Sequence, residues 1–182
     1  EFGPYGYLKA EEVEFTITDT AEIQKVEMKD DVPIGRIIIN KKGEFLSEVS
    51  WNDMVAGAMD SIWGYVTGSL KDVTFEIYAR EDIKAADGES DDYYKKDELV
   101  ATIKTDELGI ARTDDLPLGK YYVVEKETAD GFVLDGEPRD IDLTYRDQDT
   151  PVVTFDSEWQ NSRQKAKVIV TKKEKDSDRV LE

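Results

Sequence analysis

The stretch LPLGKYYVVEKETADGF, residues 116–132, decides the fold of this chain because it places a glutamate inside a run of strand-forming residues. It opens with a Pro/Gly turn and continues as KYYVVEKE (120–127), whose aromatic and β-branched residues favour a strand. Alternate side chains of a strand share a face, so Tyr121, Val123 and Glu125 point the same way. The other residues on that face are apolar. Because a carboxylate is costly to bury alone, we expect Glu125 to have a partner in the core.

Two further polar residues fall at inward positions by the same spacing. Lys41 follows Ile37 and Ile39 at strand period, and Asn161 follows Trp159 in the same way. An inward lysine, glutamate and asparagine on three separate strands are the ingredients of an amide cross-link that the chain makes within itself.

Strand patterns dominate the rest of the chain. Turn residues separate the strand-like stretches, and no alternation of strands with helices appears. We therefore predict an all-β fold, an antiparallel β-sandwich. The other expected strands are 36–41, 73–79, 98–105, 139–145, 151–159 and 167–173.

One segment departs from this pattern. In SWNDMVAGAMDSIWGYVTG, apolar residues recur at helical spacing, Ser50 and Asp53 form a capping box, and Gly68 can end a helix. We predict an inserted amphipathic helix over 50–67, which either covers an edge of the sandwich or binds a partner. The apolar stripe consists of Trp51, Met54, Val55, Ala58, Met59, Ile62, Trp63 and Val66.

Composition excludes several classes of function. The 182 residues carry 42 acidic and 24 basic side chains, a net charge of −18, which argues against nucleic-acid partners and anionic membrane surfaces. The longest apolar runs are too short to insert in a membrane. Cysteine and histidine are absent, so disulfides, cysteine nucleophiles, Ser-His-Asp catalysis and ordinary zinc sites are excluded. We expect no cofactor and no metal. The acidic loop 80–98 lacks the spacing of an EF-hand and is expected to be solvated.

The chain also repeats itself at a long interval. Lys41 and Lys172 lie 131 residues apart, and Asp30 matches Asn161 at the same offset. A period this long indicates tandem domains rather than short repeats. We expect residues 1–31 to be the C-terminal strands of a preceding domain, 33–163 a complete domain, and 165–182 the first strand of a following one.

These features resemble the Cna B-type, or SpaA-like prealbumin-fold, domains of Gram-positive surface proteins and pilins. The segment GKYYVVEKETADGF is similar to their glutamate motif G-K-Y-x-x-x-E-x-x-A-P-x-G-Y, with Thr128-Ala129 in place of Ala-Pro. The first-strand pattern I-x-I-x-K ends at Lys41, and VTFEIYA (73–79) is similar to the second strand. The resemblance covers about 33–172, and the predicted helix lies outside the usual pattern.

The resemblance implies an intramolecular isopeptide bond. By position, Lys41 is the nucleophile, Asn161 the acyl acceptor and Glu125 the proton shuttle. Burial disfavours a charged lysine, and a buried Glu125 carboxyl can polarise the Asn161 carbonyl and pass a proton to departing ammonia. The fold would supply proximity for one turnover.

Alternatives remain at each position. Lys41 and Glu125 can form only a buried ion pair, with Asn161 hydrogen-bonded nearby. Lys42, of opposite parity, is the second candidate for the nucleophile, and Asp156 falls on the outward face. Repeat matching would make Asp30 an acceptor for an upstream lysine. Lys172 lacks a glutamate motif to assist it, so we predict no bond there.

The resemblance implies a structural stalk or spacer module of a tandem-domain surface adhesin or pilin-like protein, extracellular and attached to the cell surface or wall. Its partners would be neighbouring like domains, with any host or matrix ligand unknown. The alternative is a ligand-binding adhesive module that uses the predicted helix 50–67 and the loop 80–98. An enzyme with paired carboxylates is disfavoured, because Glu125 has no second inward acid on a strand near it.

Overall fold

The computed structural model describes residues 6–8, 10, 12–19, 23–51, 58–166, 169–177 and 179–180. Ten strands form two sheets of six and four strands. The six-stranded sheet contains β1 (Ile34–Trp51), β2 (Ala58–Ser69), β5 (Ile110–Arg112), β6 (Leu116–Pro117), β9 (Val152–Asn161) and β10 (Ile169–Thr171). The four-stranded sheet contains β3 (Thr74–Ala79), β4 (Leu99–Lys104), β7 (Lys120–Glu127) and β8 (Arg139–Asp142).

Strand β1 organises the larger sheet. It pairs with β2, β5, β6 and β9, and β10 continues the sheet from β2. The smaller sheet has the order β4-β3-β7-β8. Apolar side chains of β1 and β9 face those of β3 and β7, and the central ones are wholly buried, among them Ile37, Ile39, Phe75, Ile77 and Val123. The predicted all-β sandwich is confirmed.

One strand pair departs from the antiparallel pattern. Strands β1 and β9 run parallel over ten residue pairs, from Ile34 beside Val152 to Gly43 beside Asn161. Parallel neighbours need a long connection. Here the connection consists of the strands β2 to β8, which lie between β1 and β9 in the chain. The first and last strands of the unit therefore lie side by side.

The predicted helix over 50–67 is wrong. Trp51 ends β1 and residues 58–67 belong to β2, whereas residues 52–57 lie outside the described residues. The two strands form a long antiparallel ladder in which Val49 lies beside Trp63 and Phe45 beside Val66. Gly64 disfavours a helix interior, and the neighbouring aromatic and β-branched residues suit a strand. The apolar residues of the segment do recur at helical spacing. Backbone pairing between β1 and β2 nevertheless makes the described residues strands.

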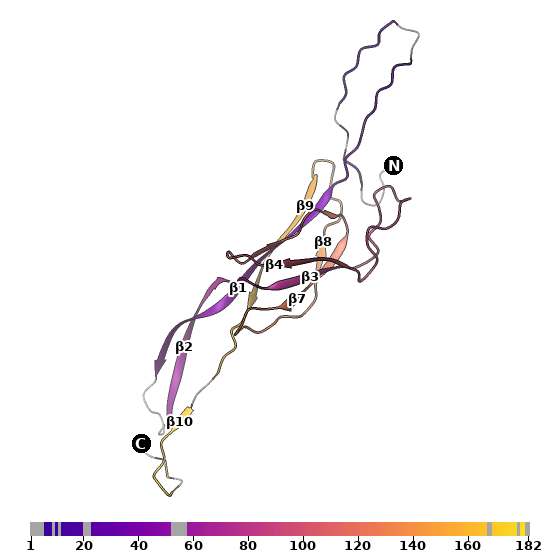
Figure 1. The fold of residues 1–182 in the computed structure, drawn as a ribbon. Helices are drawn as coiled ribbons and strands as arrows, with labels where there is room; N and C mark the ends of the chain where they lie inside the picture. The colour runs from indigo at the N-terminus through magenta and orange to yellow at the C-terminus, as the bar shows by residue number, and fades with distance from the viewer. Residues whose placement is uncertain are drawn as a thin grey trace.

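The molecule is elongated (Figure 1). The outer part of the β1–β2 hairpin, residues 46–51 and 58–66, projects from one end of the sandwich, and we call it the arm. The extended segments 12–19 and 23–32 project from the opposite end. Both carry exposed apolar side chains, such as Phe15 and Met28 in the segments and Leu46 and Val66 in the arm. Among the described residues, no helix is long and apolar enough to span a membrane.

Candidate functional site

Three strands bring the three predicted polar residues together. Lys41 lies on β1 and Asn161 at the end of β9, while Glu125 comes from β7 in the opposite sheet. Each follows buried apolar residues at alternate positions, so each points between the sheets. The three residues are 1–2% exposed. The inward faces expected for these residues are confirmed.

The three side chains form a closed hydrogen-bonded group. The Lys41 Nζ lies 2.6 Å from Glu125 Oε2 and 2.7 Å from Asn161 Oδ1 and donates to both. The amide nitrogen of Asn161 donates to Glu125 Oε1, and also to Thr128 Oγ1 at 2.8 Å. The Glu125 carboxylate thus bridges the lysine amine and the amide nitrogen.

The surroundings of Lys41 make its deprotonation easier, because they lower the pKa of its amine. Burial lowers the pKa of Lys41 below its ordinary value, because the charged ammonium loses its hydration. The hydrogen bond and the charge of Glu125 raise the pKa of Lys41 but only partly offset this effect. A nucleophilic amine must be uncharged, so the direction of the shift suits an attacking lysine.

Aromatic side chains enclose the group. The Phe75 ring lies beside Glu125 on the neighbouring strand, with its centroid 5.7 Å from Lys41 Nζ. Phe75 meets Trp159 edge to face, with ring centroids 5.5 Å apart. The Arg139 guanidinium lies 4.4 Å from the centre of the Trp159 ring and is paired with Asp135. These rings exclude water, which strengthens the polar contacts inside.

The orientation of the Asn161 amide differs from the expectation. Glu125 contacts the amide nitrogen, the atom that would leave as ammonia, rather than the carbonyl oxygen. The carbonyl oxygen instead accepts from Lys41. The sequence analysis also assigned no role to Thr128. The feature that could have indicated one is that Thr128 stands where the family motif has alanine.

The other candidate residues lie away from this group. Lys42 is half-buried on the opposite face of β1, and Asp156 is exposed and accepts a hydrogen bond from Asn40. Asp30 and Lys172 are both exposed. The strand β10, which ends next to Lys172, lies at the arm, far from the N-terminal segments (Figure 1).

A glycine fixes the backbone of Lys41. The Gly109 carbonyl accepts a hydrogen bond from the Lys41 N–H at 2.7 Å, and the Lys41 carbonyl accepts one from the Leu70 N–H at 2.9 Å. Gly109 has a φ of 75°, in the left-handed region that favours glycine. A Cβ there would lie 2.5 Å from the Lys41 carbonyl oxygen. The contact leaves no room for a side chain.

We therefore expect Gly109→Ala to lower the free energy of unfolding by about 2–3 kcal/mol, because backbone strain and a backbone clash add together. Urea unfolding measures the change. Gly88→Ala is the matched control, since Gly88 has a φ of 68° but no atom within 4 Å of a new Cβ. Its expected cost is about 1 kcal/mol. Equal losses in the two variants would contradict a clash with the Lys41 backbone.

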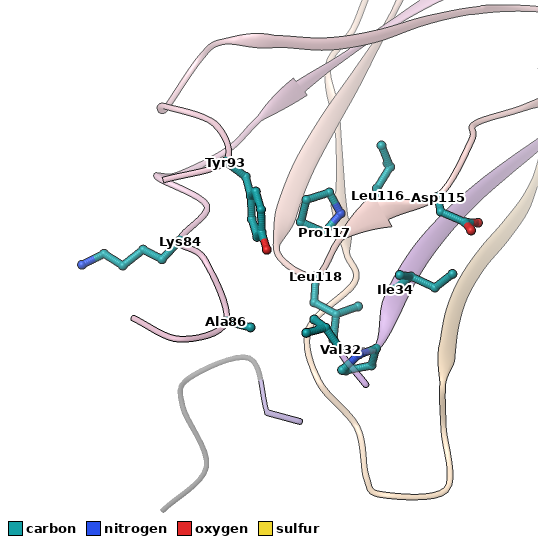
Figure 2. A pocket seen from close by; sticks show the side chains of 10 residues that line it. Val32, Ile34, Lys84, Ala86, Tyr93, Asp115, Leu116, Pro117 and Leu118 are labelled. Carbon is teal, nitrogen blue, oxygen red and sulfur yellow. The ribbon is translucent and has the colours of Figure 1, made fainter. Parts of the chain in front are cut away.

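The acidic loop contributes to a hollow at the other end of the sandwich. A cavity of about 240 Å³ lies beside the start of β1, and its wall includes Lys84, Ala86 and Tyr93 from the loop. Figure 2 shows the Tyr93 side chain turned toward Leu118 and Val32, whereas the Lys84 side chain extends away from them. None of the three residues of the hydrogen-bonded group lines it.

Metal binding finds no support in the part of the chain that the structure describes. Within these residues, no group of three or more acidic side chains is arranged to hold a metal ion.

Solved structures with a similar fold come from Gram-positive bacteria. The Bacillus anthracis TIE protein is 19% identical with a TM-score of 0.53, and the match covers 86% of this chain and 22% of that one. The minor pilin of Streptococcus agalactiae is 18% identical with a TM-score of 0.43, covering 75% and 48%. The major pilin SpaD of Corynebacterium diphtheriae is 21% identical with a TM-score of 0.43, covering 71% and 32%. The chain therefore spans between about a fifth and a half of the length of these proteins.

No curated protein matches the sequence. A family profile does match it, that of the SpaA prealbumin-like fold domain, over residues 65–159. The matched range covers more than half of the chain and includes Glu125, the whole four-stranded sheet and part of the six-stranded one. Lys41 and Asn161 lie outside it. The chain belongs to the SpaA prealbumin-like fold domain family.

Proposed function

We propose that this protein is a structural stalk module of a Gram-positive surface protein and that it closes an isopeptide bond between Lys41 and Asn161. The single observation that carries the proposal is the buried group in which Lys41 Nζ lies 2.7 Å from the Asn161 amide oxygen and 2.6 Å from Glu125. A permanent buried ion pair would repay its desolvation poorly. A reaction that consumes the amine removes that cost.

The chemical step conserves every proton. The Lys41 ammonium first gives a proton to Glu125, and the neutral amine attacks Asn161 Cγ. The Nζ–Cγ bond forms and the Cγ–Nδ2 bond breaks, so the amide nitrogen leaves as ammonia. Of the three ammonium protons, one stays on the new amide, one leaves with ammonia by way of Glu125, and one remains on the Glu125 carboxyl. Glu125 contacts both nitrogens, as this relay requires.

The position of the bond suits a module that carries tension. Because β1 and β9 are parallel neighbours, a pull on the start of β1 and the end of β9 would shear the two strands. A Lys41–Asn161 bond would carry this force directly from β1 to the end of β9. Residues 42–160 would then lie outside the load path. A stalk needs this property, whereas a ligand-binding module does not.

We also propose that like domains flank the complete one, as the long repeat predicts. At its C-terminal end, the Val133 N–H donates to the Ser162 carbonyl at 2.8 Å. In the N-terminal segments, the Leu8 N–H donates to the Asp31 carbonyl, also at 2.8 Å. Asp31 and Ser162 lie 131 residues apart, the spacing of the repeat. The same kind of backbone hydrogen bond thus occurs twice, once in the N-terminal segments and once at the end of the complete domain.

Side-chain contacts join the N-terminal segments, which carry the first of these two hydrogen bonds, to the complete domain. The side-chain amide of Gln148 donates to the Tyr7 carbonyl at 2.9 Å and to the Tyr145 hydroxyl at 2.7 Å. The Tyr145 ring lies so close to Gly6 that a Cβ there would be 2.7 Å away. This contact favours a fixed junction between neighbouring domains, which are the partners we propose. A place on the cell surface follows from this role and from the pilins of similar fold.

An adhesive module is the second candidate, and one observation favours it. The described residues of the helix expected for that alternative form strands instead. The loop 80–98, however, helps to form the cavity of about 240 Å³. Tyr93 is 48% exposed at its wall. Binding to host or matrix components that Tyr93→Ala abolishes, with the fold unchanged, would support this alternative. Unchanged binding would remove it.

The test of the isopeptide proposal is the mass of the intact protein. We expect the purified chain to be lighter than its sequence by one ammonia, and proteolysis to release a branched peptide that joins Lys41 to Asn161. Tandem mass spectrometry locates the branch. A chain at full mass would exclude the bond and leave a buried ion pair.

A further inference from the structure

Thr128 lies against the atom of Asn161 that must leave. Its hydroxyl oxygen accepts a hydrogen bond from Asn161 Nδ2 at 2.8 Å. The residue follows directly after the end of β7, three positions beyond Glu125. The family motif commonly has alanine at this position, so the hydroxyl is a feature of this chain.

The hydrogen bonds of the Asn161 amide are complete only with Thr128. The amide oxygen accepts from Lys41, and one amide N–H donates to Glu125. The second N–H donates to Thr128. A primary amide has two N–H donors, and a buried donor left unpaired is unfavourable. Without the hydroxyl, the second N–H would be left unpaired, and only Lys41 and Glu125 would hold the amide.

A tilt of the amide would separate the reacting groups. In the present orientation, the carbonyl faces the Lys41 amine and the nitrogen faces Glu125, which supplies its proton. Lys41 and Glu125 already disfavour a half rotation of the amide, because it would set donor against donor and carbonyl against carboxylate. A tilt of the amide that brings the unpaired N–H toward another acceptor would instead draw the departing nitrogen away from the proton donor. The rate of such reactions is sensitive to small misplacements of this kind.

We propose that Thr128 is a positioning residue, which holds the Asn161 amide with its leaving nitrogen between Glu125 and the Thr128 hydroxyl. Thr128 is half-buried, whereas the other three residues are buried. The leaving nitrogen therefore faces the more open wall of the site, toward which ammonia can depart. The inference depends on the isopeptide bond proposed above.

The test follows bond formation in newly made full-length protein. Cell-free synthesis is stopped after a short pulse, and the fraction lighter by one ammonia is measured over time by intact mass. We expect Thr128→Val, which keeps the shape but removes the hydroxyl, to slow the reaction about tenfold. Thr128→Ser keeps the hydroxyl, so it should react at nearly the wild-type rate. A purely structural role for the threonine methyl group would give the opposite ranking.

Thr113→Val is the matched control. Thr113 is also half-buried, and its hydroxyl accepts an N–H, from Ile37 at 3.1 Å, but it does not touch the Asn161 amide. We expect its reaction rate to stay within about twofold of wild type, because the loss of one hydrogen bond elsewhere should affect stability rather than chemistry. Circular dichroism checks that each variant is folded. Thr128→Ala replaces the valine variant if valine prevents folding.

The outcomes separate the two proposals. A tenfold loss in Thr128→Val alone, rescued by serine, supports the positioning role. A wild-type rate in Thr128→Val, or an equal loss in Thr113→Val, overturns it while leaving the bond intact. If the wild-type protein never loses ammonia, the isopeptide proposal itself fails.

Discussion

Replacing Glu125 with glutamine is expected to leave the protein at its full mass and to lower its free energy of unfolding by about 5 kcal/mol. The variant keeps the size of the side chain but removes the group that takes a proton from Lys41 and passes one to the leaving nitrogen. Without the bond, the unfolded chain regains the freedom of a loop that spans 120 residues. The chain-entropy relation assigns about 5 kcal/mol to closing such a loop. Intact mass and denaturant unfolding measure the two effects.

Three further variants make this result specific. Lys41→Met and Asn161→Ala each remove one partner of the bond and should also stay at full mass. Glu127→Gln is the matched control, because Glu127 is exposed, two residues further along the same strand. It should lose ammonia as the wild type does. A Glu125→Gln protein that still loses ammonia would show that the carboxyl is not the proton shuttle.

The wild-type protein, pulled from its two ends, is expected to show no extension from the segment between Lys41 and Asn161. With the bond in place, the force passes from β1 to β9 through one covalent link. In Glu125→Gln, the same pull should shear β1 from β9 and release the 119 residues between the two. Extended chain spans about 3.4 Å per residue, so the release should lengthen the molecule by about 400 Å. Single-molecule force spectroscopy measures this step.

Glu127→Gln again serves as the control and should behave as the wild type under force. A release of about 400 Å in wild-type molecules that have lost ammonia would contradict the proposed load path. Such a result would place the cross-link between other residues, and the branched peptide would identify them.

Much of the site followed from periodicity in the sequence. Glu125, Lys41 and Asn161 each stand at an inward position of a strand whose other inward residues are apolar, and the structure buries all three. A polar residue among apolar ones at period two is a local signal, since the pleat alone decides which way a side chain points. The sandwich class was equally accessible, because turn residues separate the strand-forming stretches.

The segment 50–67 shows where local patterns were insufficient. Its apolar residues fit a helical stripe, yet its described residues belong to β1 and β2, two strands that pair with each other. Pairing with a neighbouring strand satisfies the backbone hydrogen bonds of alternate residues. No residue within the segment shows that such a neighbour is present. Gly64, in the interior of the predicted helix, was local evidence against it.

The class of fold, the inward face of each strand and the three residue types that meet in the core could all be inferred from the amino-acid sequence. Only the tertiary structure decided that β1 and β9 run parallel, that Glu125 faces the nitrogen of the Asn161 amide, and that Thr128 holds that nitrogen. The physical reason is the distance along the chain between the residues that decide each feature. A side chain's face depends on its own strand, whereas strand partners and amide orientation depend on contacts between residues that are distant in the chain.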